Sequence, residues 1–210
     1  MATRTTKVPK HLRVRRNPED GEREILDAAE EVLRELDFRD LTVDGVMGRT
    51  GMVRSAFYTY FESRNDLAMR LLQRIEAEMM AASATWLEQP LDDPVAGIDA
   101  GLLEVAETYA RHGHVLRAIH EASYHDREVE LYYRGGLIQN FIDAVAARIR
   151  AENEAGRADV DDPEAVARAL LLLNSNLFVE RLGGSDSDSP EAVAATLALI
   201  WRRTIYPGGT

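Results

Sequence analysis

Residues 42–66 read TVDGVMGRTGMVRSAFYTYFESRND, and this stretch decides the fold. Thr42 stands where a side-chain oxygen caps the first turn of a short helix. Gly51 lies where a tight turn needs a residue that tolerates positive φ. A second short helix follows, with Phe57 and Phe61 turned toward the core. The stretch therefore predicts two short helices joined by a glycine turn.

The exposed face of the second helix, expected over about residues 53–61, combines cationic, hydroxyl and aromatic side chains. Such a face on the second of two short helices is typical of a helix-turn-helix, which places that helix in the major groove of DNA. Ser63 and Asp66 have the spacing of a capping box and predict the start of a longer helix. The residues on the exposed face are Arg54, Ser55, Tyr58, Thr59 and Tyr60.

The rest of the chain also predicts helices, because apolar residues recur at intervals of three and four and few runs alternate as a strand does. Two segments near the C-terminus, about 165–178 and 190–206, are apolar on more than one face, which indicates burial on more than one side. The predicted fold class is all-α. Four helix starts pair a capping residue with a proline, and they are Asn17-Pro18, Asp93-Pro94, Asp162-Pro163 and Ser189-Pro190.

Composition excludes several classes of protein. The chain has 210 residues, of which 45% are apolar and 29% charged, an ordinary globular balance. It has no cysteine, which excludes disulfide scaffolds, thiolate metal sites and cysteine nucleophiles. No apolar run is long enough to span a membrane, and the first residues lack the pattern of a secretory signal. We therefore expect a cytoplasmic protein without a membrane partner.

The net charge of −11 is unevenly spread along the chain. Residues 1–18 hold six Lys and Arg and no acid, whereas residues 75–210 hold eleven basic and twenty-three acidic residues. A cationic arm in front of an acidic body is either a solvated tail or a segment that meets a polyanion.

The segment from Glu24 to Leu72 resembles the DNA-binding domain of the TetR family of bacterial regulators, in five blocks with the right spacing. The C-terminal part is similar to the ethionamide-resistance repressor subgroup at residues 169–174, 177–178, 200–201 and 205–206. The five N-terminal blocks are Ile25-Leu26-Asp27-Ala28-Ala29, Leu41-Thr42-Val43, Thr50-Gly51, Phe57-Tyr58-Thr59-Tyr60-Phe61 and Ser63-Arg64-Asn65-Asp66-Leu67.

This resemblance implies about nine helices in two parts. A basic disordered arm is expected over residues 1–17 and a helix-turn-helix DNA-binding domain over 18–62. A linking helix with a regulatory, ligand-binding and dimerisation domain is expected over 63–210, and the last two helices are implied to form a homodimer. The partner is then double-stranded DNA carrying an operator, and we favour contact of the arm with that DNA. The expected DNA-binding residues are Thr42, Arg54, Ser55, Tyr58, Thr59, Tyr60, Arg64 and, in the arm, Arg13, Arg15 and Arg16.

Three residues depart from the family's usual pattern. Val53 stands where the family usually has a Ser or Thr cap, and Ala56 where it often has a Thr that contacts phosphate. Arg64 replaces the usual Lys at the start of the fourth helix and still binds phosphate, in a bidentate manner. The first two departures transfer the binding to the remaining contacts and to the arm.

The resemblance also implies an apolar cavity for a small-molecule effector among the regulatory helices, with ordinary core packing as the alternative for its aromatic residues. Asn174 and Asn176 lie in the most apolar helix, where a buried amide must find partners. They either bond across a dimer interface or orient a ligand, and Asn174 is the better ligand candidate. The expected cavity residues are Ile98, Leu102, Val105, Tyr109, Ile119, Tyr124, Tyr133, Phe141, Val145, Asn174, Phe178 and Trp201.

His112, His114, His120 and His125 fall close together, but their loose spacing favours polar helix ends over a metal site. No serine has an identifiable histidine and acid partner, and no glycine loop is placed to cradle a phosphate. We therefore expect no metal, no cofactor and no enzymatic activity.

The sequence predicts a dimeric, ligand-responsive transcriptional regulator. The favoured form is a repressor that binds a palindromic operator and is released by an apolar small molecule. An activator or a ligand-independent regulator of the same family stays open, as does a dimeric small-molecule carrier without a specific DNA target.

Overall fold

The computed structural model describes residues 17–88, 93–184 and 188–206, and every regular element in these residues is a helix, which confirms the all-α class. The first part holds α1 (Pro18–Leu33), the 3-10 turn η1 (Phe38–Asp40), α2 (Val43–Met47), the 3-10 turn η2 (Arg54–Ala56) and α3 (Phe57–Tyr60). The second part holds α4 (Arg64–Glu88), α5 (Pro94–Ala122), α6 (Arg127–Tyr132), the π-helical segment η3 (Tyr133–Ile138), α7 (Gln139–Glu154), α8 (Pro163–Leu182) and α9 (Pro190–Ile205).

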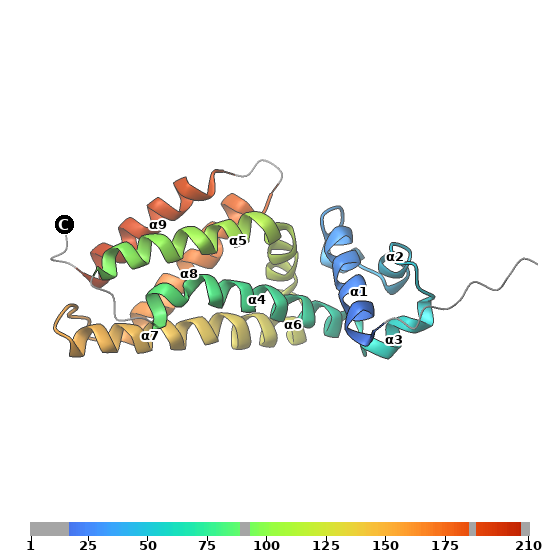
Figure 1. Ribbon diagram of the computed structural model, residues 1–210, viewed down its shortest axis with the longest axis horizontal. Helices are drawn as coiled ribbons and strands as arrows, with labels where there is room; N and C mark the ends of the chain where they lie inside the picture. The colour runs from blue at the N-terminus through green and yellow to red at the C-terminus, as the bar shows by residue number, and fades with distance from the viewer. Residues whose placement is uncertain (1–16, 89–92, 185–187, 207–210) are drawn as a thin grey trace, which may run out of the picture.

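The helices divide into a small module and a long bundle (Figure 1). α1, α2 and α3 gather at one end, and α4 runs from beside them along the bundle that it forms with α5, α7, α8 and α9. α4 begins at Arg64, next to the expected boundary between residues 62 and 63. That division into domains stays a prediction, because α4 belongs by its contacts to both parts.

The small module closes around aromatic and aliphatic side chains from its helices. Phe57 and Phe61 are at most 1% exposed, as their spacing predicts, and they pack with Ile25 of α1 in the same core. Burying three such side chains stabilises the module by about 1.5–3 kcal/mol each. This core fixes the orientation of α3 relative to α1.

The second short helix differs from the expectation of one helix over 53–61. It consists of the 3-10 turn η2 followed by one α-helical turn, α3. Val53 offers no side-chain acceptor at the start, and the first turn closes through a hydrogen bond from the Ala56 N–H to the Val53 carbonyl at 2.9 Å. The missing cap therefore accounts for the tighter first turn.

The expectation of positive φ at Gly51 is wrong, because the one residue with positive φ in the described chain is Gly156. The turn is instead held by side chains. The Thr50 hydroxyl donates to the Met47 carbonyl at 2.9 Å and accepts from the Met52 N–H at 3.2 Å, while the Gly51 N–H donates to Glu24 at 3.0 Å.

The predicted caps mostly form. The side chains of Asp93, Asp162 and Ser189 accept hydrogen bonds from backbone N–H groups of their helices, whereas Asn17 makes no such bond. At α4, Ser63 Oγ accepts from the Asp66 N–H at 3.0 Å, and the Asp66 carboxylate accepts from the Glu62 N–H at 2.9 Å. These bonds therefore tie the first turn of α4 to the short link that follows α3.

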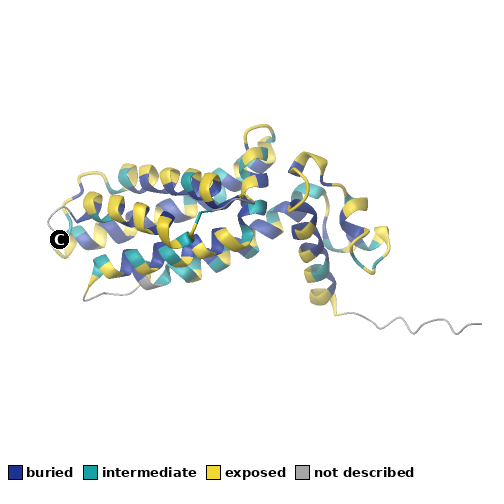
Figure 2. Cartoon of the chain, turned by 90° about the horizontal axis from the view of Figure 1, so that it is seen from above, coloured by how far each residue is buried: buried dark blue, intermediate teal, exposed yellow. Residues whose placement is uncertain are grey.

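Burial follows the helix faces (Figure 2). In the bundle, buried residues face the interior and exposed residues run along the outer surfaces. Between α6 and α7 the helix continues through η3, where Gly135 and Gly136 lie with open space at the position of a side chain. Two glycines in succession weaken the regular α-helical hydrogen-bond ladder, which fits the wider π turn at this point.

Candidate DNA-binding face and ligand cavity

The tip of the small module presents polar and aromatic side chains to solvent. Arg54, Ser55, Tyr58 and Thr59 are all exposed on η2 and α3, as expected for a face that meets DNA. Tyr58 is 54% exposed although its ring meets Phe57 edge-on, with 5.3 Å between ring centroids. A tyrosine held upright in this way presents its hydroxyl group to a binding partner.

Arg54 is held in place by its neighbours. Its Nε lies 2.6 Å from Oδ1 of Asp44 on α2, and its guanidinium lies 5.7 Å from the centre of the Tyr58 ring. Both residues are solvent-exposed, so the ion pair contributes little stability. Its consequence is positional, because it limits where the remaining N–H donors of Arg54 point. The sequence offered no sign of this role for Asp44, which resembles any acid in a helix's first turn.

Tyr60 is turned away from this face. It is half-buried, and a side chain at Gly21 of α1 would collide with its hydroxyl group and ring. Gly21 therefore has to be glycine for α1 to approach Tyr60 this closely. The structure places Tyr60 between the tip and α1 rather than beside Tyr58.

Thr42 and Arg64 both bond within the module. Thr42 Oγ1 caps α2 by accepting from the Gly45 N–H at 3.0 Å. Arg64 donates to the carbonyl oxygens of Arg39 at 3.2 Å and Leu41 at 3.4 Å, and its guanidinium lies 4.9 Å from the centre of the Phe38 ring. Arg64 therefore lies against η1 here. The expected arm residues Arg13, Arg15 and Arg16 lie outside the described residues.

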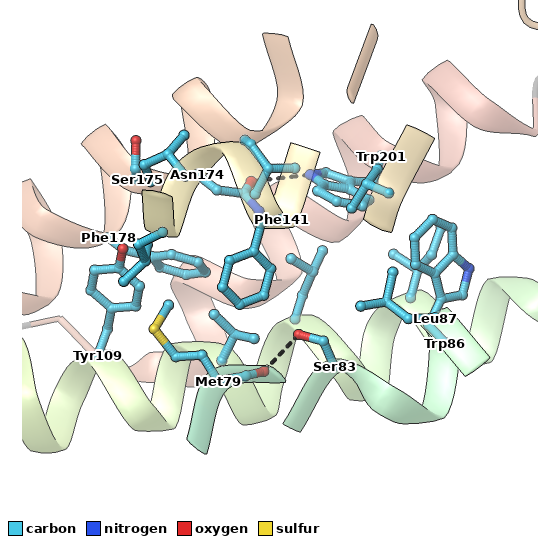
Figure 3. Close-up of a pocket in the computed structure, with 18 residues that line it drawn as sticks. Met79, Ser83, Trp86, Leu87, Tyr109, Phe141, Asn174, Ser175, Phe178 and Trp201 are labelled. Atoms are coloured by element: carbon cyan, nitrogen blue, oxygen red, sulfur yellow. Dashed lines mark hydrogen bonds between the residues drawn. The ribbon is translucent and has the colours of Figure 1, made fainter. Parts of the chain in front are cut away.

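An apolar cavity lies inside the bundle, between α4, α5, α7, α8 and α9 (Figure 3). Its free space is about 60 Å³. By the usual measure of about 10–15 Å³ for each water this is room for a few waters, far less than the ~300–1,000 Å³ of a pocket for a drug-sized ligand. Any such ligand has to displace wall side chains such as Met79 and Phe141.

The polar groups on the cavity wall are few, and most already have partners. Ser83 Oγ donates to the Met79 carbonyl at 2.9 Å, and Ser175 Oγ donates to the Leu172 carbonyl at 3.1 Å. Asn174 Oδ1 accepts from the Trp201 indole N–H at 3.0 Å. The Asn174 Nδ2 makes no hydrogen bond to another described residue, so it is a donor available to a ligand. The indole N–H of Trp86, on the same wall, is also without a hydrogen-bond partner among the described residues.

Aromatic rings close both ends of the cavity. Trp86 and Trp201 meet edge to face with 5.6 Å between centroids, and Tyr109 and Phe178 lie 4.8 Å apart. Burial raises the pKa of the Tyr109 hydroxyl well above its ordinary value, so that group stays neutral. Trp86 therefore forms part of the cavity wall.

Most of the expected cavity residues come together here, and three do not. Ile119, Tyr124 and Tyr133 lie outside the cavity. For Ile119 the reason is the length of α5, whose 29 residues extend about 43 Å at 1.5 Å per residue, so that its last turns reach the small module. Tyr124 is 59% exposed, while Tyr133 bonds to His120 at 3.2 Å. The expected residues that line the cavity are Ile98, Leu102, Val105, Tyr109, Phe141, Val145, Asn174, Phe178 and Trp201.

The sequence reasoning missed the contribution of α4. Met79, Ser83, Trp86 and Leu87 line the cavity from that helix, at spacings of four, three and one that fit one helical face. Their spacing indicates a shared face, but nothing in the sequence distinguishes a cavity wall from a helix contact. The other cavity residues not expected are Gly101, Leu137, Ile138, Leu171 and Ser175.

The two last helices carry an exposed apolar strip on the side away from the cavity. Leu172, Leu173, Leu199 and Ile200 are between 37% and 43% exposed. Asn176 is also exposed there and bonds to the Leu172 carbonyl at 2.7 Å, so it lies outside the cavity. We name Leu172, Leu173, Leu199 and Ile200 the outer strip.

Neither a metal site nor a membrane-spanning helix is found among the described residues. Within the described ranges, no group of three or more His, Asp or Glu side chains is arranged to hold a metal ion. Among the helices that the structure describes, none combines the length and the apolar character needed to cross a membrane.

Comparison with protein families gives two matches. Residues 25–71 match the family "Bacterial regulatory proteins, tetR family", and residues 98–207 match "Transcriptional regulator EthR, C-terminal domain". The HTH-type transcriptional regulator EthR of Mycobacterium tuberculosis is 32% identical over 192 residues, covering 90% of this chain and 88% of that protein. EthR of Mycolicibacterium smegmatis is 30% identical over 177 residues, covering 84% and 79%.

Solved structures share the fold at low identity. A TetR-family regulator from Syntrophomonas wolfei superposes with a TM-score of 0.77 at 10% identity, covering 89% of this chain and 95% of that one. NalD of Pseudomonas aeruginosa, a secondary repressor of the MexAB-OprM multidrug efflux pump, has a TM-score of 0.72 at 18% identity, covering 91% and 100%. These similarities show the fold alone.

Proposed function

Because the chain belongs to the TetR family of bacterial transcriptional regulators, in its EthR-like subgroup, we propose that it is a dimeric repressor released from its operator by an apolar small molecule. The proposal gives it no catalytic role. It acts where chromosomal DNA is found, in the cytoplasm.

One observation carries the proposal: α4 belongs to both candidate sites. Its first turn is bonded through Asp66 to Glu62 and Ser63, in the short link that follows α3, and its other half supplies Met79, Ser83 and Trp86 to the cavity. A ligand that enlarges the cavity moves that half of α4, and the rigid helix carries the shift to the recognition helix. By linkage, a ligand that weakens DNA binding itself binds more weakly to the DNA complex.

The outer strip supports a two-fold dimer through α8 and α9. The strip exposes four large apolar side chains. The same strip of a second copy would bury them in an isologous contact, which removes apolar surface from water. Such a dimer sets two recognition helices into successive major grooves, about 34–36 Å apart, on a palindromic operator.

On DNA, the tip divides its contacts by chemistry. Arg54 and Ser55 stand at the start of the recognition helix, where side chains reach base edges. Tyr58, Thr59 and the arginines of residues 1–17 supply phosphate and sugar contacts, which position the protein without reading sequence. Arg64 joins them by releasing its bonds to the η1 carbonyls.

The effector is apolar with one hydrogen-bond acceptor, such as a carbonyl or ether oxygen. Aromatic and aliphatic side chains dominate the wall, and the Asn174 Nδ2 supplies the donor. Because the free space is about 60 Å³, a ligand binds only if wall side chains rearrange. Occupancy of the cavity is therefore coupled to the conformation of the bundle.

Fluorescence anisotropy tests the proposal, with a duplex that the protein itself selects from a random-sequence library. A scrambled duplex and two salt concentrations accompany it, because non-specific phosphate binding falls steeply with salt. Retained preference at high salt, lost on addition of apolar compounds, supports a ligand-released repressor. Equal binding to both duplexes contradicts it and favours a carrier. A promoter fusion then distinguishes repression from activation.

A further inference from the structure

One imidazole bridges two carboxylates where α1, α4 and α5 meet. In α5, His112 has its Nδ1 2.7 Å from Oε1 of Glu30 on α1 and its Nε2 3.1 Å from Oε2 of Glu78 on α4. A neutral imidazole has one N–H and one lone pair, so it donates to only one carboxylate, whereas an imidazolium donates to both. The geometry therefore fits protonated His112.

Charges around this contact favour the same state. Glu30 is 8% exposed and also accepts from Arg74 of α4 at 2.6 Å. The hydrogen bond to Glu30 raises the pKa of His112, with further support from the charge of Glu78. Burial opposes ionisation of Glu30, but its hydrogen bond to His112 and the nearby cations lower the pKa of that carboxyl.

Other charged and titratable groups surround His112 on α1, α4 and α5. Arg34 and Asp27 lie on α1, and Asp27 is paired with Arg74 at 2.6 Å; Arg111 of α5 lies 3.5 Å from Glu78. His114 Nε2 accepts from Arg34 Nε at 3.3 Å, which requires that nitrogen to be unprotonated. Burial and the charge of Arg34 lower the pKa of His114. Of the two histidines, His112 is the one whose pKa is raised by its carboxylate partners.

Gly113, between these histidines, anchors α5 to the other side of the bundle. A side chain there would collide with the carbonyl oxygen of Leu182 at the end of α8 and would come within 2.9 Å of Gly183 Cα. α5 is therefore pressed against α8 at Gly113, while His112 and His114 reach α1. The segment 112–114 thus connects a helix of the outer strip to the small module.

We propose that His112 is a positioning residue that holds the DNA-binding module on the regulatory bundle in its imidazolium form, so that operator affinity falls as the pH rises through its deprotonation. The inference rests on the proposed DNA-binding function. A histidine whose pKa is raised in the folded state contributes its bond fully at low pH and loses it as pH rises through that pKa. Deprotonation leaves two carboxylates facing one N–H and frees the angle of α1 against α5. A module free to move binds two half-sites less tightly, since fewer molecules have the competent geometry.

Operator affinity against pH tests this, with the full-length dimer and the library-selected duplex at constant ionic strength. Between about pH 6 and pH 8.5 the wild-type Kd is expected to rise about five- to tenfold relative to the scrambled duplex, the scale of a typical coupling. His112→Gln keeps a hydrogen-bonding amide but does not titrate, so its profile is expected to be flat. His125→Gln, the same change at an exposed histidine, is the control and retains the wild-type slope.

A second variant guards against simple misfolding. Glu78→Gln removes the charge beside Nε2 at a partly exposed position and keeps Glu30, so the midpoint of the profile is expected to move to lower pH. A wild-type protein with no slope, or a slope retained in His112→Gln, overturns the proposal.

Hydrogen exchange of α1 amides without DNA separates this inference from the proposed function. After correction for intrinsic rates, α1 is expected to exchange faster at high pH in the wild type and at all pH values in His112→Gln. Exchange of α1 that does not depend on pH overturns the positioning role even if DNA binds. If exchange of the α1 amides depends on pH and on His112 but the protein prefers neither duplex, the positioning role of His112 stands and the DNA-binding function is rejected.

Discussion

The indole N–H of Trp201 donates a hydrogen bond of 3.0 Å to Oδ1 of Asn174, inside the protomer and at the cavity wall. Both side chains are at most 5% exposed. The bond joins α9 to α8 and fixes the orientation of the amide, with Nδ2 left for a ligand. The two roles considered for Asn174, an interhelical bond and a ligand contact, are therefore compatible, because each uses a different atom.

Asn174→Leu is expected to lower the free energy of unfolding by about 1–3 kcal/mol, since the Trp201 N–H then lacks an acceptor in an apolar wall. Trp201→Phe removes the donor and also costs packing. The double variant is expected to lose less than the sum of the two, because no polar atom is left unpaired. Urea unfolding at one fixed protein concentration measures all three, as the stability of a dimer depends on concentration. Strictly additive losses would show that the bond carries no coupling.

Arg54→Ala is expected to weaken binding to the selected duplex about tenfold to a hundredfold, the value of a base contact by an arginine, with less effect on scrambled DNA. Asp44→Asn keeps the size of that side chain but removes the partner of Arg54. We expect it to reduce the preference between duplexes while it strengthens scrambled binding, because one acid leaves a surface that faces phosphate.

Arg127→Ala provides the matched control for both variants. Arg127 is as exposed as Arg54 or more, and it is paired with Glu130 at 2.7 Å on α6, away from the tip. Anisotropy at two salt concentrations measures the three proteins together. An effect of Arg127→Ala as large as that of Arg54→Ala would contradict a specific role for the tip.

Sequence patterns anticipated local structure better than they anticipated the cavity. Caps such as Asp93 and Asp162 depend on residues next to one another, and they form as expected. The side facing the cavity depends on which helices become neighbours, so Met79 of α4 was missed although its neighbours share its face. Tyr133 of η3 lies outside the cavity although Leu137 and Ile138 of the same segment line it, and this difference also depends on which helices become neighbours.

Details of the tip also required the folded chain. The Arg54–Asp44 pair joins residues on two separate elements. The turn at Gly51 has no positive φ and is held instead by side-chain hydrogen bonds, such as that from the Met52 N–H to the Thr50 hydroxyl. The helix-turn-helix itself was predictable, because its two aromatic core positions and its glycine turn lie within one short stretch. Which side chains of the helix-turn-helix face outward was only partly predictable, since Tyr60 lies against Gly21 of α1.

Leu172→Arg and Leu199→Arg, single changes in the outer strip, are expected to convert the dimer to monomer and to weaken operator binding at least tenfold, because each buries a charge twice in a two-fold interface. Leu131→Arg on α6 is the matched control, since that leucine is 56% exposed but lies outside the strip. Analytical ultracentrifugation reads the assembly state directly. Dimers retained in both strip variants, or lost in Leu131→Arg, would place the interface elsewhere.

Glu152 is fully buried near the end of α7, between two arginines. Arg157 donates to the Glu152 carboxylate from Nε at 2.7 Å and from Nη2 at 2.9 Å. Nη2 of Arg148 lies 2.7 Å from Oε1 of the same carboxylate. The hydrogen bonds to Arg157 come first among the causes that lower the pKa of Glu152, and the charge of Arg148 adds to them against the effect of burial. A carboxyl group of this kind contributes stability above its unfolded pKa and loses it as the pH falls through the lowered folded value.

Glu152→Gln is therefore expected to cost about 3 kcal/mol at neutral pH, the lower end of the range for breaking a buried pair, because Arg157 is 42% exposed. The gap between wild type and variant is expected to hold from neutral pH down to the unfolded pKa of about 4.3 and to narrow below it. Urea unfolding at a series of pH values measures the gap, with Glu154→Gln on the exposed side of the same helix as the control. A gap that stays constant down to pH values well below that point would mean that Glu152 stabilises the fold by its shape rather than by its charge.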